Sequence, residues 1–269
     1  MTMPKFSANL GFLWTDRPLL DRISAAASAG FRAVELHWPY DVPAELVKKS
    51  CEKHGLELLG INTPVGDAAN GDFGLAALPG RQLDFAESFH QAADYARQSG
   101  ASSIHVMAGV VDQAADPDAA NVFAENLTFA AGVAADLTLL LEPINQRDKP
   151  GYFYSTIAEA AALIGRVGAP NIRIMFDVYH VGVSEGDVLK RLEYHLPMIG
   201  HVQIAAVPSR AEPDEGEIAY GAIFTALDRL GYPSWIGCEY KPRSRTDEGL
   251  HWMDTFGVTL RSTTRSNSG

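Results

Sequence analysis

The chain has 269 residues, of which 46% are hydrophobic and 20% charged, which is enough apolar sequence for a large buried core. Its formal net charge of −11 argues against a nucleic-acid partner, because such partners require a basic face. No apolar run approaches the roughly 20 residues of a membrane span, and the N-terminus lacks a signal peptide's apolar core. We therefore expect a cytoplasmic protein that binds neither nucleic acid nor membrane. A small anionic substrate remains compatible with this charge, since a few local cations suffice to hold one.

Strand-like apolar runs alternate with amphipathic stretches of helical spacing along nearly the whole chain. The runs span residues 5–12, 33–38, 56–62, 103–109, 138–144, 172–179, 199–205 and 235–240. Eight such runs in a chain of this length predict the α/β class and a single-domain (β/α)8 TIM barrel. The alternative is a doubly wound open sheet, but no glycine-rich phosphate-binding sequence follows the first run. We place the barrel at residues 1–258 and expect a flexible C-terminal tail at 259–269, which is rich in Ser and Thr.

Two of the predicted strand-to-helix connections are long, at residues 63–80 and 206–221. Connections beyond about 12–15 residues are uncommon and are often functional. Both would lie on the C-terminal face of the barrel, where TIM-barrel enzymes keep their active sites. The first is rich in glycine and is a candidate lid.

Four consecutive predicted strands each carry an oxygen-bearing side chain near their C-terminal end. These residues are Glu142, Asp177, Gln203 and Glu239. In a closed parallel barrel the strand ends converge, and three carboxylates in one small volume oppose one another's ionisation. A divalent cation resolves this conflict, and oxygen ligands suit Mg²⁺ or Mn²⁺. The pattern therefore predicts a metal site built by these four residues.

Simpler interpretations exist for each of these polar residues. A single glutamate at a strand end is usually a cap or an ion-pair partner, and a buried Gln203 would often bond only to backbone. His180 follows Asp177 by three residues and would, in the simplest case, hydrogen-bond a neighbour. Arg210, in the second long connection, is either solvated or a clamp for an anion. We expect two further histidines, His105 and His201, to have structural roles inside the barrel.

An ordered set of short motifs resembles the hydroxypyruvate isomerase family of xylose-isomerase-like TIM barrels. The motifs are "FSANLGFLW", "PYD", "ALPGR", "EPIN", "PGYF", "FDVYH", "HVQIA", "EPDEGEI" and "WIGCEYKPR". The resemblance covers about residues 5–256. It implies a metal-dependent isomerase in which Glu142 and Glu239 are the catalytic acid–base pair. It also implies that His180 and Arg210 contact the substrate, and that the protein forms a homo-oligomer, a dimer or a tetramer.

The reaction that the resemblance implies is aldose–ketose isomerisation of a small anionic hydroxy-oxo acid through a cis-enediolate. Hydroxypyruvate, converted to tartronate semialdehyde, is the first candidate substrate, and 2-oxo-tetronate is the alternative. Ketose 3-epimerases are related, but they usually carry a histidine where this chain has Gln203. A non-catalytic barrel that binds a sugar acid is a further alternative. The apurinic-site endonucleases with similar barrels need many histidine ligands and a basic groove, which this acidic chain does not offer.

Overall fold

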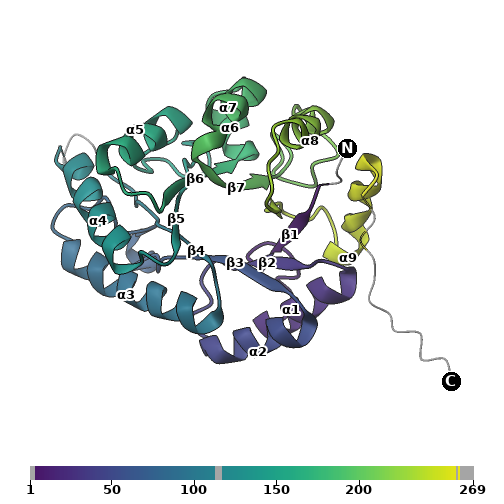
Figure 1. The fold of residues 1–269 in the computed structure, drawn as a ribbon, viewed down its shortest axis with the longest axis horizontal. Coiled ribbons are helices and arrows are strands. Elements are labelled where there is room, and N and C mark those ends of the chain that lie inside the picture. The colour runs from purple at the N-terminus through teal and green to yellow at the C-terminus, as the bar shows by residue number, and fades with distance from the viewer. Residues whose placement is uncertain (1–3, 113–116, 259, 261–269) are drawn as a thin grey trace.

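Eight parallel strands close into one barrel, and helices surround it on the outside (Figure 1). The structure, a computed structural model, describes residues 4–112, 117–258 and 260. The strands are β1 (Phe6–Asn9), β2 (Ala33–Glu35), β3 (Glu57–Asn62), β4 (Ser103–His105), β5 (Thr138–Leu141), β6 (Ile172–Asp177), β7 (Ile199–Ile204) and β8 (Ile236–Cys238). Because β1 pairs in parallel with β8, the sheet has no open edge. The predicted TIM barrel is confirmed, and the open doubly wound sheet is excluded.

Several strands end earlier than the apolar runs indicated. The fourth run was expected to reach residue 109, whereas β4 ends at His105, and Val106, Met107 and Ala108 are buried outside the strand. The sixth was expected to reach residue 179, whereas β6 ends at Asp177 and a helix begins at Val178. The residues just past these two strand ends are themselves buried, so apolar sequence continues past the last pairing of the strand.

The helices follow the strands in the expected alternation. They are α1 (Leu19–Ala29), α2 (Ala44–His54), α3 (Gln82–Ser99), α4 (Ala119–Val133), α5 (Ile157–Val167), α6 (Val178–Ser184), α7 (Val188–His195), α8 (Tyr220–Arg229) and α9 (Thr246–Gly249). Helix α5 illustrates the sequence logic. Thr156 and Glu159 form a capping box at its start, and its buried residues Ile157, Ala160 and Ile164 recur at helical spacing. This apolar face packs onto the barrel.

The first long loop, residues 63–80, is fastened to the loop that follows β4. Gly74 and Ala108 form an antiparallel bridge, and Ala77 N–H donates to the Ala108 carbonyl oxygen at 2.7 Å. Gly74 has a φ of +107°, and a Cβ there would lie 2.5 Å from the Met107 carbonyl oxygen. Only glycine fits this close approach. The loop is thus fastened at the C-terminal end of the barrel, and its role as a lid stays a prediction.

The chain ends are only partly covered by the structure. The expected tail, residues 259–269, lies outside the described residues except for Leu260, so the domain limit at residue 258 stays a prediction. Within the described ranges, none of the helices has the length and apolarity needed to cross a membrane. The expected cytoplasmic location stays a prediction.

Candidate active site

The four residues expected to bind metal lie at the C-terminal ends of four neighbouring strands. Glu142 directly follows β5, Asp177 is the last residue of β6, and Glu239 directly follows β8. Gln203, in β7, is the register partner of Asp177. Each of the four is at most 5% exposed. The barrel therefore buries three carboxyl groups and one amide at the same end.

Burial and mutual repulsion both act on these acids. Burial raises the pKa of the Glu142 carboxyl well above its ordinary value, and the charges of Glu239 and Asp177 raise it further. Burial, followed by the Glu239 charge, raises the pKa of Asp177 to about 7. Ionisation of all three carboxyl groups is therefore unfavourable unless a positive charge lies close to them.

One oxygen of each of the four residues is buried without a hydrogen-bond donor. These atoms are Glu142 Oε1, Asp177 Oδ2, Gln203 Oε1 and Glu239 Oε2. A buried polar atom without a hydrogen-bond partner lowers stability by about 1–3 kcal/mol. A cation bound by these four oxygens would remove this cost. An oxygen-only donor set matches hard divalent cations. The residues present therefore fit a divalent metal ion.

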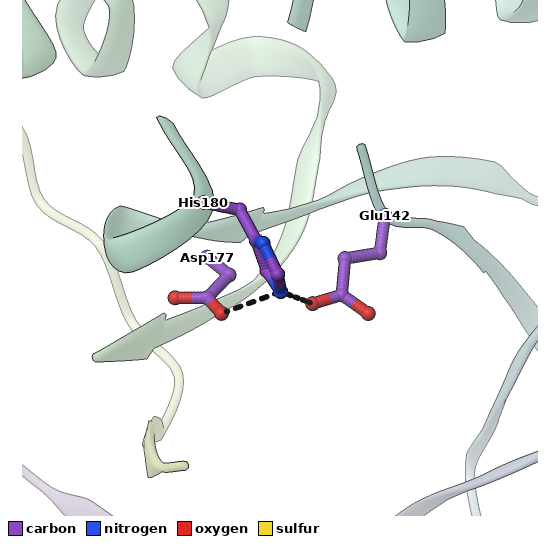
Figure 2. Close-up of side chains that lie close together, drawn as sticks. All are labelled: Glu142, Asp177 and His180. Carbon is purple, nitrogen blue, oxygen red and sulfur yellow. Dashed lines mark ion pairs between the residues drawn. The ribbon is translucent and has the colours of Figure 1, made fainter. Parts of the chain in front are cut away.

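Figure 2 shows a group of potential ligands formed by Glu142, Asp177 and His180. One ligand atom from each lies within 4.8 Å of the others. Glu239 lies outside this group. Its Oε1 lies 3.1 Å from His37 Nε2 and 3.6 Å from Arg210 Nη2, so two other side chains engage this carboxylate.

His180 is oriented as a hydrogen-bond donor toward the acids. Asn145 Oδ1 accepts from the Asp148 backbone N–H at 2.8 Å, which turns Asn145 Nδ2 toward His180 Nδ1 at 2.7 Å. The Asn145 backbone N–H also donates to this nitrogen, at 3.1 Å. Burial, together with the Arg210 charge, holds the pKa of His180 well below its usual value, so the ring is neutral.

The hydrogen of the neutral His180 ring therefore resides on Nε2, because Nδ1 accepts two hydrogen bonds. Nε2 lies 3.6 Å from both Glu142 Oε1 and Asp177 Oδ2 (Figure 2). A nitrogen that carries hydrogen offers no lone pair to a metal. In this tautomer His180 Nε2 is a hydrogen-bond donor, so a metal ion held here would have to rely on oxygen ligands.

Arg210 is a partly buried cation beside the acids, with 14% of its side chain exposed. It adopts a left-handed backbone conformation, with φ of +57°, in the loop after β7. Its guanidinium carbon lies 4.8 Å from the ring centre of Phe12 and 4.9 Å from that of Tyr179. Nη1 lies 3.3 Å from Asp148 Oδ2, and Nη2 approaches Glu239. The Arg210 charge therefore lies beside the Glu239 carboxylate at the C-terminal end of the barrel.

The sequence analysis missed two site residues from the first half of the barrel, Glu35 and His37. Glu35 ends β2 and is buried, and both line the same pocket as Glu142, Gln203 and Glu239. The signal was present in "AVELHW", where a polar residue follows an apolar run, as it does at the other strand ends. One pocket therefore brings these two residues together with Glu142, Gln203 and Glu239, whereas Asp177, His180 and Arg210 are not among its lining residues.

The two histidines expected inside the barrel are there. His105 is buried, with Nδ1 at 3.4 Å from Glu142 Oε2, and burial lowers its pKa to about 3. His201 Nε2 lies 3.0 Å from Glu35 Oε1. Burial by itself lowers the pKa of His201, but the charge and hydrogen bond of Glu35, together with the charges of Glu239 and Asp177, outweigh burial and raise the pKa.

Fold and site together define an α/β-barrel protein with a potential metal centre at the C-terminal mouth. The family model of the xylose isomerase-like TIM barrel matches residues 23–256, and the chain belongs to this family. The 2-oxo-tetronate isomerase of Cupriavidus necator is 46% identical over 259 residues, covering 94% of this chain and 99% of that protein. The hydroxypyruvate isomerase of Escherichia coli is 38% identical, covering 94% and 100%. These relatives confirm the expected family and the expected class of enzyme, an isomerase.

Solved structures agree with the fold. A Brucella melitensis structure described as an AP endonuclease of family 2 is 39% identical, with a TM-score of 0.90, covering 94% of this chain and 99% of that one. A structure of L-ribulose 3-epimerase, 23% identical with a TM-score of 0.74, shares the fold alone.

Proposed function

We propose that this protein is a divalent-metal-dependent aldose–ketose isomerase of a small hydroxy-oxo acid. The observation that carries the proposal is the set of four buried oxygens, one on each of four consecutive strands, that have no hydrogen-bond donor. Glu142, Asp177, Gln203 and Glu239 would hold Mg²⁺ or Mn²⁺ through these atoms. When bound, the ion would supply positive charge that polarises the carbonyl and hydroxyl oxygens of the substrate.

Glu142 and Glu239 serve as the acid–base pair. Isomerisation moves a proton from a hydroxyl-bearing carbon to the neighbouring carbonyl carbon, through a cis-enediolate. For hydroxypyruvate the proton leaves C3 and one is delivered to C2, while a proton passes between the two oxygens, so the product is an isomer. The two glutamates come from β5 and β8, which are not adjacent in the barrel, so they reach the substrate from different sides.

Arg210 and His180 bind the substrate in this account. The Arg210 guanidinium offers charge and hydrogen bonds to the substrate carboxylate. The Nε2–H of His180 donates to a substrate oxygen, because Asn145 already occupies Nδ1. The loop at residues 63–80 covers the mouth and excludes water, which protects the enediolate from side reactions.

Hydroxypyruvate and 2-oxo-tetronate are the two substrates to test. The "EPIN" motif after β5 favours hydroxypyruvate, as the family resemblance implies. The 46% identity to the Cupriavidus necator 2-oxo-tetronate isomerase favours the four-carbon acid. The two acids differ by one hydroxylated carbon, so the depth of the pocket decides between them.

A DNA substrate fits poorly, despite the description of the Brucella melitensis relative. The chain has a net charge of −11, whereas DNA binding draws on a basic surface. The four proposed ligand atoms, which have no hydrogen-bond donor, are all oxygens, whereas zinc favours nitrogen or sulfur ligands. A small acid with its own carboxylate matches Arg210, which lies beside the acids, better.

Proton NMR in D₂O tests the proposal. Metal-stripped protein is mixed with hydroxypyruvate or 2-oxo-tetronate, with and without Mg²⁺ or Mn²⁺. Metal-dependent isomerisation, with deuterium entering the carbon that receives the proton, is expected, and the faster acid identifies the substrate. If metal-loaded protein neither turns over nor exchanges either acid, the proposed activity is wrong, and free ketohexoses become the next substrates to assay.

A further inference from the structure

Glu35 is a buried carboxylate that none of the proposed catalytic steps uses. It ends β2, is 5% exposed, and lines a pocket together with three of the proposed metal ligands, Glu142, Gln203 and Glu239. Four polar side chains contact it, and the longest of these contacts is from Asn9 Nδ2, which donates to Oε2 at 3.5 Å. Gln203 Nε2 donates to Oε2 at 2.8 Å, Ser7 Oγ donates to Oε1 at 2.5 Å, and His201 Nε2 lies 3.0 Å from Oε1.

The contact between Glu35 and Gln203 determines which end of the Gln203 amide reaches the metal site. A carboxylate accepts hydrogen bonds, so it attracts the amide NH₂ and repels the amide oxygen. With NH₂ facing Glu35, Gln203 Oε1 is the buried atom left without a donor. An amide flipped by 180° would present NH₂ to the metal and could not coordinate it.

We propose that Glu35 is a positioning residue for the metal site, which fixes the Gln203 amide with its oxygen available as a ligand. This inference rests on the proposed function, because it assigns Gln203 Oε1 to a divalent cation. It extends that function by one residue from β2, a strand that contributes none of the proposed ligands. Groups that orient metal ligands commonly change metal affinity 10–100-fold when they are replaced.

An independent feature of the barrel supports this role for Glu35. Gly237 in β8 lies against both members of the pair. A Cβ at this position would lie 2.3 Å from Glu35 Oε1 and 2.8 Å from Gln203 Cγ. The backbone of β8 thus leaves room for the Glu35 carboxylate to reach the amide, and any larger residue at 237 would displace one of the two side chains.

Mn²⁺ binding to the metal-stripped protein, followed by isothermal titration calorimetry, tests the inference. Glu35→Gln keeps the shape of the side chain but can accept or donate, so it no longer selects one orientation of Gln203. We expect Mn²⁺ to bind at least about tenfold more weakly, while circular dichroism shows a folded barrel. Ser7→Ala is the matched control, because it removes a hydrogen bond to the other oxygen of Glu35 and leaves the Gln203 contact. It should bind Mn²⁺ within about twofold of wild type.

A second comparison separates positioning from a general structural role. In a Gln203→Ala background there is no amide to orient, so adding Glu35→Gln should change Mn²⁺ affinity less than about twofold. If Glu35→Gln weakens Mn²⁺ binding equally in the wild-type and Gln203→Ala backgrounds, the inference is overturned. Wild-type Mn²⁺ affinity in the folded Glu35→Gln protein would also overturn it. If Glu35→Gln does not fold, Gly237→Ala provides the same test, with weakened Mn²⁺ binding expected and unchanged binding overturning the inference.

The wild-type titration distinguishes this inference from the proposed function. Wild-type protein that binds no Mn²⁺ would contradict both. Wild-type protein that binds Mn²⁺ and isomerises a hydroxy-oxo acid, beside a Glu35→Gln variant that binds Mn²⁺ equally well, would contradict only the role of Glu35.

Discussion

The two carboxylate oxygens of Glu239 have different surroundings. Oε1 contacts His37 and Arg210, while Oε2 has no donor. This division suits a group that binds metal and moves a proton. Replacing Glu239 with Gln keeps the shape and removes the base, so turnover should fall by about 10²–10⁴-fold with the fold intact. Steady-state assays of the metal-loaded variant measure this.

The control for Glu239→Gln is Glu87→Gln, on the exposed outer side of α3 (Gln82–Ser99). It makes the same chemical change far from the strand ends and should retain wild-type turnover. Near-normal turnover in metallated Glu239→Gln would remove Glu239 from the acid–base pair.

A conservative substitution also tests the proposed role of Arg210 in substrate binding. Its planar guanidinium lies between Phe12 and Tyr179, an arrangement that the ammonium of lysine cannot reproduce. Arg210→Lys keeps the charge but loses paired hydrogen bonds to the substrate carboxylate. KM should rise by about tenfold, more than kcat falls, in steady-state kinetics. Arg229→Lys, at an exposed ion pair with Glu193, should leave both constants unchanged.

The raised pKa of Asp177 predicts how the free energy of unfolding depends on pH. Burial and the Glu239 charge raise it from 3.8 to about 7 in the folded, metal-free protein. The folded state therefore binds this proton more tightly than the unfolded chain does. The free energy of unfolding should fall as pH rises through this window, with no further contribution from Asp177 well above pH 7.

Thermal melting at pH 6 and pH 8 measures this effect. Metal-free wild type should melt a few degrees lower at pH 8. Asp177→Asn cannot ionise and should show a smaller difference, and what remains includes the contribution of His201, whose raised pKa acts in the same direction. Equal pH dependence in wild type and Asp177→Asn would contradict the assigned shift.

At the scale of elements, the loop at residues 63–80 connects the fold to the chemistry. Gly74 forms the bridge to Ala108 and has no room for a Cβ. Gly74→Ala should detach the loop, so limited proteolysis should cut it faster and turnover should fall severalfold. The control is Gly71→Ala in the same loop, where φ is +95° but nothing lies within 4 Å of a Cβ. It imposes comparable backbone strain without the clash.

If Gly71→Ala and Gly74→Ala behave alike in proteolysis and turnover, the bridge does not hold the loop. A difference confined to Gly74→Ala would support a closed loop as a requirement for catalysis.

At the scale of the whole molecule, the barrel could be predicted because each strand and helix has its own periodic signal. The positions of Glu142, Asp177 and Glu239 could be predicted for a similar reason, since each interrupts or ends an apolar run. The exact strand ends could not, because the buried loops at the mouth are as apolar as the strands. Glu35 carried the same signal as the three acids and was overlooked.

Other features of the site depend on side-chain geometry that no sequence pattern contains. The hydrogen on His180 Nε2 follows from how the Asn145 amide is turned. The contact between Glu35 and Gln203 joins residues 168 positions apart. The expected homo-oligomer, whether dimer or tetramer, stays a prediction of the family resemblance.

In the proposed function, oxygens from four strand ends hold a divalent cation on which isomerisation depends. Titrating metal-stripped protein with Mn²⁺, while following both heat release and the isomerisation of hydroxypyruvate and 2-oxo-tetronate, tests it most directly. We predict one ion bound per chain and turnover of one of the acids that rises in proportion to the bound ion. Full turnover by the metal-free protein, or Mn²⁺ binding that persists when both Glu142 and Asp177 are replaced by their amides, would contradict it.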